Sequence, residues 1–267
     1  MKNKTKIIGI LNITDDSFSD GGKYLKISEA INHIKTMVLN GCCIIDIGAE
    51  STRPGFKEVS DDDQLLRILP IIDEIKKIKE DIKISIDTRS SIVAESALKM
   101  GATIINDVSG GKSDKNMFDV IAKYKAEVIL THMPDEHLLN TTATYDNILK
   151  HLEDYFKELI EQACLCGIDH KDIIIDPGIC FGKSGKDNIK ILKNMKHLVS
   201  VFTRLCIGVS NKRFSSKIFD NINDGEMHIA ALTVSTLATC SEVEFLRVHN
   251  VEANHDAVEV AWKTINS

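Results

Sequence analysis

Two aspartates at the ends of short apolar runs are the residues of this sequence best suited to bind a ligand. Asp176 follows three isoleucines and precedes Pro177, which cannot continue a central strand because proline lacks the backbone donor. Asp87 ends the run KISID in the same way. A carboxylate at the edge of a core must find hydrogen-bond donors or become protonated, since an unpaired buried charge is costly. Each aspartate is therefore a helix cap, an internally bonded group or a ligand-binding group.

Other polar side chains follow further runs of this kind. Asn106 lies in TIIND, Lys212 follows LCIGV, and Arg247 and His249 lie in EFLRVHN. Two carboxylates beside an amide and a lysine suit a flat, neutral ligand with adjacent N–H donors, because one carboxylate accepts two parallel hydrogen bonds. Arg247 and His249 suit an anion, and the loops after the last two strands of a barrel often bind phosphate.

These polar residues belong to a repeated unit of strand, loop and helix. Residues 6–12 form an apolar run that ends at Asn12, followed by a loop rich in Asp, Ser and Gly. The other predicted strands span 43–48, 83–87, 103–107, 127–132, 173–178, 205–209 and 244–250. Apolar residues at helical spacing predict helices over 28–40, from 61, over 91–100, over 115–124, around 149–163 and over 253–264.

Eight such units in steps of roughly 33 residues predict an α/β fold, a (β/α)8 TIM barrel, better than an open sheet. We expect one domain over residues 1–267, since no Pro-rich or Ser-rich linker interrupts the series. The carboxyl ends of barrel strands meet at one face, where active sites of this architecture lie. The polar residues predicted to converge there are Asn12, Asp87, Asn106, Asp176, Lys212, Arg247 and His249.

The composition excludes several function classes. A net charge of −6 and a pI near 5.9 give no general attraction to nucleic acid or to an anionic membrane. The seven cysteines include no CxxC pair, so we expect reduced thiols, and the nine histidines have no HxxxH spacing that would favour zinc. The absence of a long apolar run predicts a cytoplasmic protein without a membrane span or signal peptide.

Six segments together resemble the successive signatures of the dihydropteroate synthase family: GILNITDDSFSDGG, DIGAESTRPG, SIDTRS, ATIINDVSGG, IIIDPGICFGKS and RVHN. They occur in the family's order and span nearly the whole chain. The resemblance implies a (β/α)8 barrel, commonly a homodimer, that is a target of sulfonamides. It also implies that the protein joins p-aminobenzoate to 6-hydroxymethyl-7,8-dihydropterin diphosphate and releases diphosphate, which makes dihydropteroate for folate biosynthesis.

The resemblance implies a role for each matching residue. Asp176 would accept from the 2-amino group and N3–H of the pterin, while Asn106 and Asp87 would bind the other ring edge. Lys212 would reach the ring carbonyl and N5. The mechanism implied is dissociative, with a positive charge on the exocyclic methylene, and Asp87, Lys212 and Arg247 are the residues expected to take part in catalysis.

The diphosphate end of the substrate has its own implied residues. Arg247 and His249 would bind the diphosphate directly, and Asn12 would do so through Mg²⁺, which prefers oxygen ligands and phosphates. Thr52 and Arg53 lie on a loop that is expected to close over the site and exclude water.

Two positions near the aminobenzoate depart from the family pattern. The usual SRKS reads here as Ser210, Asn211, Lys212 and Arg213. The pterin lysine is retained, and Ser210 and Arg213 are expected near the aminobenzoate. A guanidinium binds a carboxylate well, but its bulk changes the pocket, so the affinity for p-aminobenzoate and the response to sulfonamides stay open.

Two further departures concern the backbone and the charge of the site. Cys180 stands where the family usually has glycine, a replacement that is harmless only if the backbone φ there is negative. Asn250 replaces an aspartate after His249 and removes a negative charge near the expected diphosphate.

Three other functions remain compatible with parts of the sequence. A pterin-dependent corrinoid methyltransferase shares the barrel, but it needs no diphosphate site, and STRPG with Arg247 argues against it. A non-catalytic homologue that binds pterin diphosphate is motivated by the altered SNKRF loop. An aldolase with a Schiff base on Lys212 is disfavoured because the polar neighbours do not desolvate that lysine. His132 alone is more typical of a satisfied barrel histidine than of a ligand.

Overall fold

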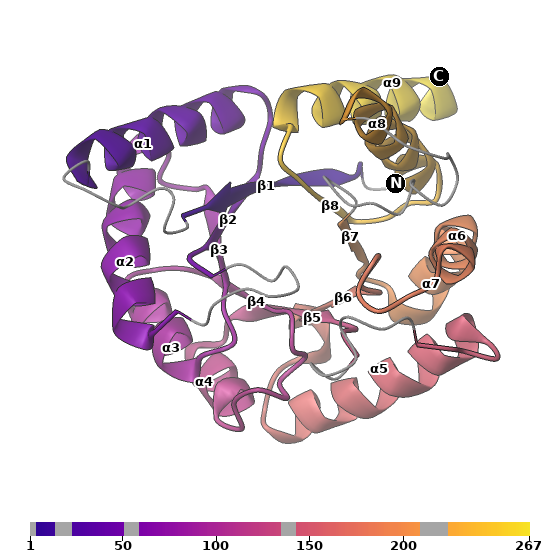
Figure 1. Cartoon of the computed structure of the whole chain (residues 1–267), viewed down its shortest axis with the longest axis horizontal. Coiled ribbons are helices and arrows are strands. Elements are labelled where there is room, and N and C mark those ends of the chain that lie inside the picture. Colours follow the sequence, from indigo (N-terminus) through magenta and orange to yellow (C-terminus); the bar gives the residue numbers. More distant parts are fainter. Residues whose placement is uncertain (1–3, 14–22, 51–58, 135–142, 209–223) are drawn as a thin grey trace.

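The computed structural model describes residues 4–13, 23–50, 59–134, 143–208 and 224–267. In this part of the chain eight strands form a ring, with the helices outside it (Figure 1). The strands are β1 (Lys6–Asn12), β2 (Ile44–Gly48), β3 (Lys83–Asp87), β4 (Ile104–Asp107), β5 (Glu127–Thr131), β6 (Ile173–Asp176), β7 (Cys206–Gly208) and β8 (Phe245–Val248). The α-helices are α1 (Lys23–Leu39), α2 (Asp61–Ile78), α3 (Ser91–Lys99), α4 (Met117–Tyr124), α5 (Ile148–Leu165), α6 (Gly185–Lys193), α7 (Met195–Phe202), α8 (Asp224–Cys240) and α9 (Val251–Asn266).

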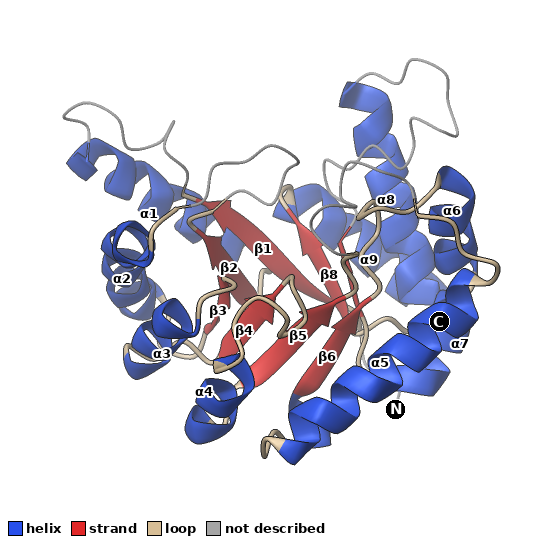
Figure 2. Cartoon of the chain, turned by 60° about the horizontal axis from the view of Figure 1, so that its bottom comes forward, coloured by secondary structure: helices blue, strands red, loops and turns tan. Residues whose placement is uncertain are grey.

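The strands are all parallel and follow the order β6-β5-β4-β3-β2-β1-β8-β7 in the sheet. The gap between β6 and β7 is joined by a parallel bridge between Ile175 and Leu205, and Ile175 N donates to Arg204 O at 3.0 Å. Helices lie around the outside of the strands in both views (Figures 1 and 2). The predicted (β/α)8 barrel is confirmed, including the short unit between Asp87 and Asn106.

Residues along each strand alternate between two separate cores. One core lies between the strands and the surrounding helices and contains most of the buried apolar residues. The other is a small cluster in the barrel interior, made of Ile8, Ile44, Ile104, Ile129, Ile174, Cys206 and Phe245. Because side chains alternate along a strand, the residues two positions later also face inward. Most of these later positions are polar, namely Asp46, Asn106, Thr131, Asp176 and Arg247.

Serine side chains cap the amino termini of three helices that follow loops at the carboxyl ends of the strands. Ser60, Ser90 and Ser184 accept from the backbone N–H three residues later, at 3.2, 3.3 and 3.1 Å respectively. Each bond satisfies one of the amides that a helix leaves unpaired at its start, which fixes where the loop ends. Asn250 caps α9 in the same way by accepting from Ala253 N at 3.1 Å, so this helix begins two residues earlier than predicted.

The described helices and cysteines agree with two expectations. None of the described helices is long and apolar enough to span a membrane. The seven cysteines, which all lie within the described ranges, form no disulfide. Burial raises the pKa of the Cys42 thiol to about 12, and its Sγ donates to Ile44 O at 2.8 Å. This thiol is therefore protonated at neutral pH and packs as a small core residue.

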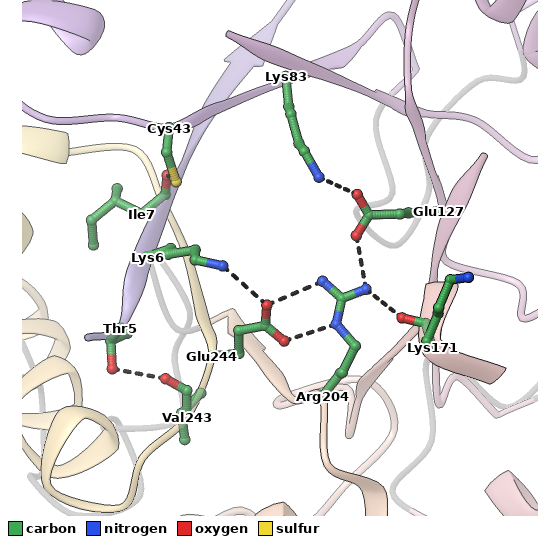
Figure 3. A network of polar contacts seen from close by, with 10 residues as sticks. All are labelled: Thr5, Lys6, Ile7, Cys43, Lys83, Glu127, Lys171, Arg204, Val243 and Glu244. Atoms are coloured by element: carbon green, nitrogen blue, oxygen red, sulfur yellow. Dashed lines mark hydrogen bonds and ion pairs between the residues drawn. The ribbon is translucent and has the colours of Figure 1, made fainter. Parts of the chain in front are cut away.

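An ion network lies at the amino-terminal end of the barrel, where the strands begin (Figure 3). Arg204 pairs with Glu244 through Nε at 2.8 Å and with Glu127 through Nη1 at 2.8 Å. Lys83 pairs with Glu127, and Lys6 Nζ lies 3.3 Å from Glu244 Oε1. These charges come from five strands or strand starts, so the network ties distant parts of the chain together at the end opposite the predicted site.

Loss of Arg204 should reduce stability without changing activity. Its side chain is 18% exposed, and Arg204→Ala removes the cation shared by two largely buried glutamates, which keep only the more exposed Lys83 and Lys6. We expect the free energy of unfolding to fall by roughly 2 kcal/mol, with the predicted activity of the folded protein unchanged. Urea denaturation measures the first and steady-state assays the second. Lys77→Ala is the control because Lys77 pairs only with helix neighbours on an exposed face, and it should leave the unfolding midpoint unchanged. A similar loss in both variants would contradict the role of the network.

Candidate active site

Four inward side chains from different strands form one hydrogen-bonded cluster at the carboxyl-end side of the barrel. Arg247 on β8 donates through Nε to Asp46 Oδ2 at 2.7 Å, and its Nη2 lies 2.6 Å from the same oxygen. Nη2 also donates to Asp87 Oδ2 at 2.6 Å. Asn106 on β4 donates through Nδ2 to Asp46 Oδ2 at 3.2 Å. The structure therefore brings together Asp87, Asn106 and Arg247, as predicted, and adds Asp46.

The cluster is buried and carries more carboxylates than cations. Burial raises the pKa of Asp87 to about 7; Arg247 opposes this rise, and the negative charge of Asp46 adds to it. Burial alone would lower the pKa of Arg247, but Asp46 and Asp87 raise it above its usual value, so the guanidinium stays protonated. With both aspartates ionised, the formal charge of the three groups is −1. A site of this kind stabilises positive charge that develops on a ligand.

Asp176 ends β6 and lies at the rim of the same barrel face. Its Oδ1 accepts from Gly178 N at 2.7 Å, which is the internal bond that one interpretation of the sequence anticipated. Within the described ranges no other group donates to this carboxylate, so Oδ2 is available to a ligand. Gly178 has φ +68°, and a Cβ there would lie 2.0 Å from His132 O. Glycine is therefore required where the chain turns to place its amide on Asp176.

Asn12 and His249 lie together at the ends of β1 and of the β8 segment. Asn12 Nδ2 is 3.4 Å from His249 Nε2. A Cβ on Gly48 would lie 3.6 Å from Asn12 Oδ1 and 3.7 Å from Asp87 Oδ2. The missing side chain of Gly48 thus leaves a space that both oxygens border.

That arrangement fits the expected Mg²⁺. The cation prefers oxygen ligands and usually binds through few protein atoms, several waters and the phosphates of a substrate. With Nδ2 of Asn12 directed toward His249, Oδ1 is the atom that remains for a cation. The described residues contain no cluster of three or more His, Cys, Asp or Glu side chains that would hold a metal ion without substrate.

Five predicted site residues lie outside the described residues: Thr52, Arg53, Ser210, Lys212 and Arg213. Their roles stay predictions. The two ends of segment 51–58 are described, and Glu50 joins them because its Oε1 accepts from Val59 N at 3.1 Å. Arg89, just after β3, donates to Glu50 Oε2 through Nη2 at 2.9 Å. Glu50 thus links the two described residues that flank segment 51–58 to Arg89 just after β3.

His132 is not part of the polar cluster inside the barrel. Its Nε2 lies 2.9 Å from Nε2 of His151 on α5, and its ring packs edge-on against Tyr155. Burial lowers the pKa of His132 to about 2, so the imidazole is neutral at neutral pH. The prediction of a satisfied barrel histidine is met only in part: Nε2 is paired on α5, whereas Nδ1 is buried and bonds to no described residue.

The loop after β6 is held by a buried lysine and contains a strained cysteine. Lys183 Nζ donates to the backbone oxygens of His132, Gly178 and Phe181 at 3.1, 2.8 and 3.2 Å. Within this loop Cys180 has φ +72°. The condition under which cysteine replaces glycine harmlessly is therefore not met, because side chains at positive φ clash with their own backbone.

Cys180→Gly should stabilise the protein. We expect a gain of about 1 kcal/mol in the free energy of unfolding, from relief of the positive-φ strain. Urea denaturation monitored by circular dichroism measures it. Cys166→Gly is a matched control, since Cys166 has φ −76°, and it should bring no gain. A lower unfolding midpoint for Cys180→Gly would show that the thiol contributes more by packing than it costs by strain.

Comparison with known proteins gives the family of this chain. The family described as "Pterin binding enzyme" matches residues 8–249. The dihydropteroate synthase of Clostridium beijerinckii is 39% identical over 260 residues, which cover 96% of this chain and 93% of that protein. This chain belongs to the dihydropteroate synthase family of pterin-binding enzymes. The dihydropteroate synthase of Bacillus subtilis is 37% identical over 251 residues, which cover 94% of this chain and 85% of that protein.

Solved structures of the family share the fold. A dihydropteroate synthase from Clostridium difficile, determined in the presence of pteroic acid, has a TM-score of 0.90 and 39% identity, and the match covers 100% of this chain and 98% of that one. The enzyme from Xanthomonas albilineans with 4-aminobenzoic acid has a TM-score of 0.89 and 31% identity, with 99% and 94% covered. The Yersinia pestis enzyme in a sulfonamide drug complex has a TM-score of 0.90 and 29% identity, with 99% and 95% covered. The family predicted from the six sequence segments is therefore confirmed.

Asp46 is the site residue that sequence analysis missed. It belongs to DIGAESTRPG, but it lies inside the strand. The candidate residues were those that follow the last apolar position of a strand. The signal was available: an aspartate with apolar neighbours in IIDIG, two positions before Gly48, faces the interior of a barrel.

Proposed function

We propose that this protein is a transferase that condenses 6-hydroxymethyl-7,8-dihydropterin diphosphate with p-aminobenzoate. The products are 7,8-dihydropteroate and diphosphate, and the reaction is a step of folate biosynthesis. The observation that carries the proposal is the buried cluster of Asp46, Asp87, Asn106 and Arg247 beside Asp176, at the barrel face where such sites lie. Related enzymes with 4-aminobenzoic acid, pteroic acid and 7,8-dihydropteroate support the choice of substrates and product.

The pterin ring is bound by hydrogen bonds at its edges. Asp176 accepts from the 2-amino group and N3–H, because two adjacent N–H groups match one carboxylate. Asn106 and Asp87 bind the opposite edge. Lys212 donates to the ring carbonyl and N5. The aminobenzoate carboxylate is placed near Ser210 and Arg213.

The diphosphate lies toward Asn12 and His249, with Thr52 and Arg53 closing over it. Arg247 uses Nε and Nη2 for the two aspartates, and within the described part of the chain its Nη1 bonds to no residue. We assign Nη1 to the leaving group. Asn12 Oδ1 is the protein atom that would hold Mg²⁺, which when bound neutralises charge on the departing diphosphate.

The reaction begins when the bond between the exocyclic methylene carbon and the diphosphate oxygen breaks. The electron pair leaves with diphosphate, and the positive charge spreads from the methylene carbon into the electron-rich ring. Ionised Asp87 stabilises that charge at short range. The amine nitrogen of p-aminobenzoate then bonds to the methylene carbon and loses a proton to solvent. No covalent intermediate with the protein is required.

The protein is further proposed to act as a homodimer in the cytoplasm and to respond to sulfonamides. Apolar residues on packed helices α8 and α9 support an association surface, since Ile229 is 64% exposed and Val260 is 67% exposed. The sulfonamide complex of a related enzyme supports the drug class. We expect Arg213 to set the extent of that response, because a guanidinium binds the carboxylate of p-aminobenzoate well.

The protein should form labelled dihydropteroate from pterin diphosphate and labelled p-aminobenzoate when Mg²⁺ is present. A chelator in excess should stop the reaction, and added Mg²⁺ should restore it. Chromatography of the labelled product is the measurement. Pterin binding without any product would instead support the non-catalytic homologue, and methyl transfer from a methylated pterin would support the methyltransferase.

Asp176→Asn should weaken binding of the pterin diphosphate by about 100-fold or more, since it replaces a charged acceptor of two hydrogen bonds by an amide that also presents donors. Isothermal titration measures the affinity directly. Asp169→Asn is a control just before the start of β6, on the far side of the barrel, and should leave affinity unchanged. Equal affinities of Asp176→Asn and the unaltered protein would refute the role of Asp176 as pterin anchor.

Activity should rise with pH through a limb near 7. The pKa of Asp87 is raised to about 7, so at lower pH the carboxyl is neutral and cannot stabilise the cation. We expect kcat/KM for the pterin diphosphate to fall by about tenfold per pH unit well below that value. Phosphorus NMR of the free substrate separates this limb from titration of the diphosphate. A rise already complete at pH 5 would show that Asp87 is not the group in question.

A further inference from the structure

We propose that Asp46 is a positioning residue of this site: it holds Asn106 and Arg247 in place and prevents Arg247 from neutralising Asp87. This inference rests on the proposed function, and it adds a residue that touches no substrate. Asp46 acts through a single carboxylate oxygen, Oδ2, which binds both partners.

The contacts of Asp46 cross the barrel interior. In the sheet, β3 separates β2 from β4, and β1 separates β2 from β8. Asp46 on β2 therefore reaches past a neighbouring strand on each side to bind Asn106 and Arg247. Contacts between strands that are not neighbours can form only between inward side chains. Asp46 thus fixes the relative positions of two binding residues that no backbone hydrogen bond connects.

The contact with Asp46 also sets which end of the Asn106 amide faces the ligand. An ionised carboxylate accepts hydrogen bonds and donates none, so the amide atom 3.2 Å from Asp46 Oδ2 must be nitrogen. The carbonyl oxygen of Asn106 is then left for the ligand as an acceptor. Without the charge of Asp46 either amide orientation would be satisfied, and the selectivity of this position for an N–H group would be lost.

The charge balance is the second consequence of Asp46. Arg247 and Asp87 alone would form a neutral pair. Arg247 Nη2 lies 2.6 Å from Asp46 Oδ2 and also 2.6 Å from Asp87 Oδ2, so one cation is shared between two anions. The net charge of −1 acts in a buried environment, where electrostatic interactions are stronger than in water. That net charge favours the positive methylene carbon formed when diphosphate leaves.

Asp46 is not explained by a local structural role. Another buried aspartate near this face, Asp107, accepts from Ser109 N and Gly111 N at 2.8 Å each and so shapes its own turn. Asp46 makes no such turn. Its Oδ1 is buried and bonds to no described residue, and an unpaired buried oxygen reduces stability. Asp46 therefore reduces stability while it orders Asn106 and Arg247, and its effect on the site is the best explanation for it.

The test compares Asp46→Asn with Ser85→Ala. Ser85 pairs with Asp46 in strand register and is equally buried, yet its hydroxyl forms no hydrogen bond with Arg247, Asn106 or any other described residue. Asp46→Asn keeps the shape of the side chain and removes its charge. We expect kcat to fall by about 10- to 100-fold, as for other residues that orient a binding side chain. We expect Ser85→Ala to remain within about twofold of the unaltered protein.

A pH profile separates positioning from packing. Among the described residues, the charged groups that act on Asp87 are Arg247 on β8, Asp46 on β2, Asp107 on β4 and Glu50 after β2. Removal of the negative charge of Asp46 should move the acid limb of activity to lower pH, because that charge raises the pKa of Asp87. Ser85→Ala should leave the limb in place.

The outcomes are distinct. Unchanged kcat and an unmoved acid limb in folded Asp46→Asn would overturn the proposal, and so would equal losses in Asp46→Asn and Ser85→Ala. If Asp46→Asn does not fold, Asp46→Ser, which also removes the charge, is measured with the same expectations. If the unaltered protein makes no dihydropteroate, the proposed function fails, but titration with pterin diphosphate still tests Asp46: binding should weaken several-fold in Asp46→Asn and not in Ser85→Ala.

Discussion

One guanidinium shared between two carboxylates is the interaction on which this active site depends. Arg247 reaches Asp46 and Asp87 from across the barrel, and Asp46 in turn binds Asn106. Burial of such a cluster is unfavourable, because each charge loses its hydration and two carboxylates share a single cation. Its value lies in chemistry, since an unbalanced negative charge beside a cationic intermediate lowers the barrier to its formation.

The barrel makes this cluster possible by separating its interior into layers. The small apolar cluster of inward residues fills the middle of the barrel, and the network around Arg204 and Glu244 lies at the amino-terminal end (Figure 3). Packed apolar side chains therefore lie next to the polar residues at the carboxyl ends and leave no room for these to move into the barrel interior. The same alternation that gives each strand an outward apolar face places Asp46 and Asn106 inside. The charged residues of the site and the charged residues of the stabilising network thus lie at opposite ends of the barrel.

Much of the fold and part of the site could be predicted from the sequence. Runs such as IIID and SID identify strands, and the ring of strand ends brought Asp87, Asn106 and Arg247 to one face as expected. Asp46 escaped because its partners lie 60 and 201 residues away, and no local pattern indicates which inward side chains meet across a barrel. The positive φ of Cys180 could not be predicted either, because it depends on the conformation of a loop that Lys183 holds through backbone oxygens. The helices α6, α7 and α8 were not delimited from the sequence, although Ser184, which caps α6, is a signal that was available.

The central claim is that the site stabilises a pterin cation after diphosphate has left and before the amine attacks. Positional isotope exchange tests this most directly. Pterin diphosphate labelled with ¹⁸O in the bridge between the methylene carbon and phosphorus is incubated with the protein and Mg²⁺, with p-aminobenzoate omitted, and is then recovered for phosphorus NMR. The account predicts that the label moves from the bridging to the non-bridging positions, because the bond breaks and re-forms reversibly. Retention of all label in the bridge, under conditions where added amine gives full turnover, would contradict it.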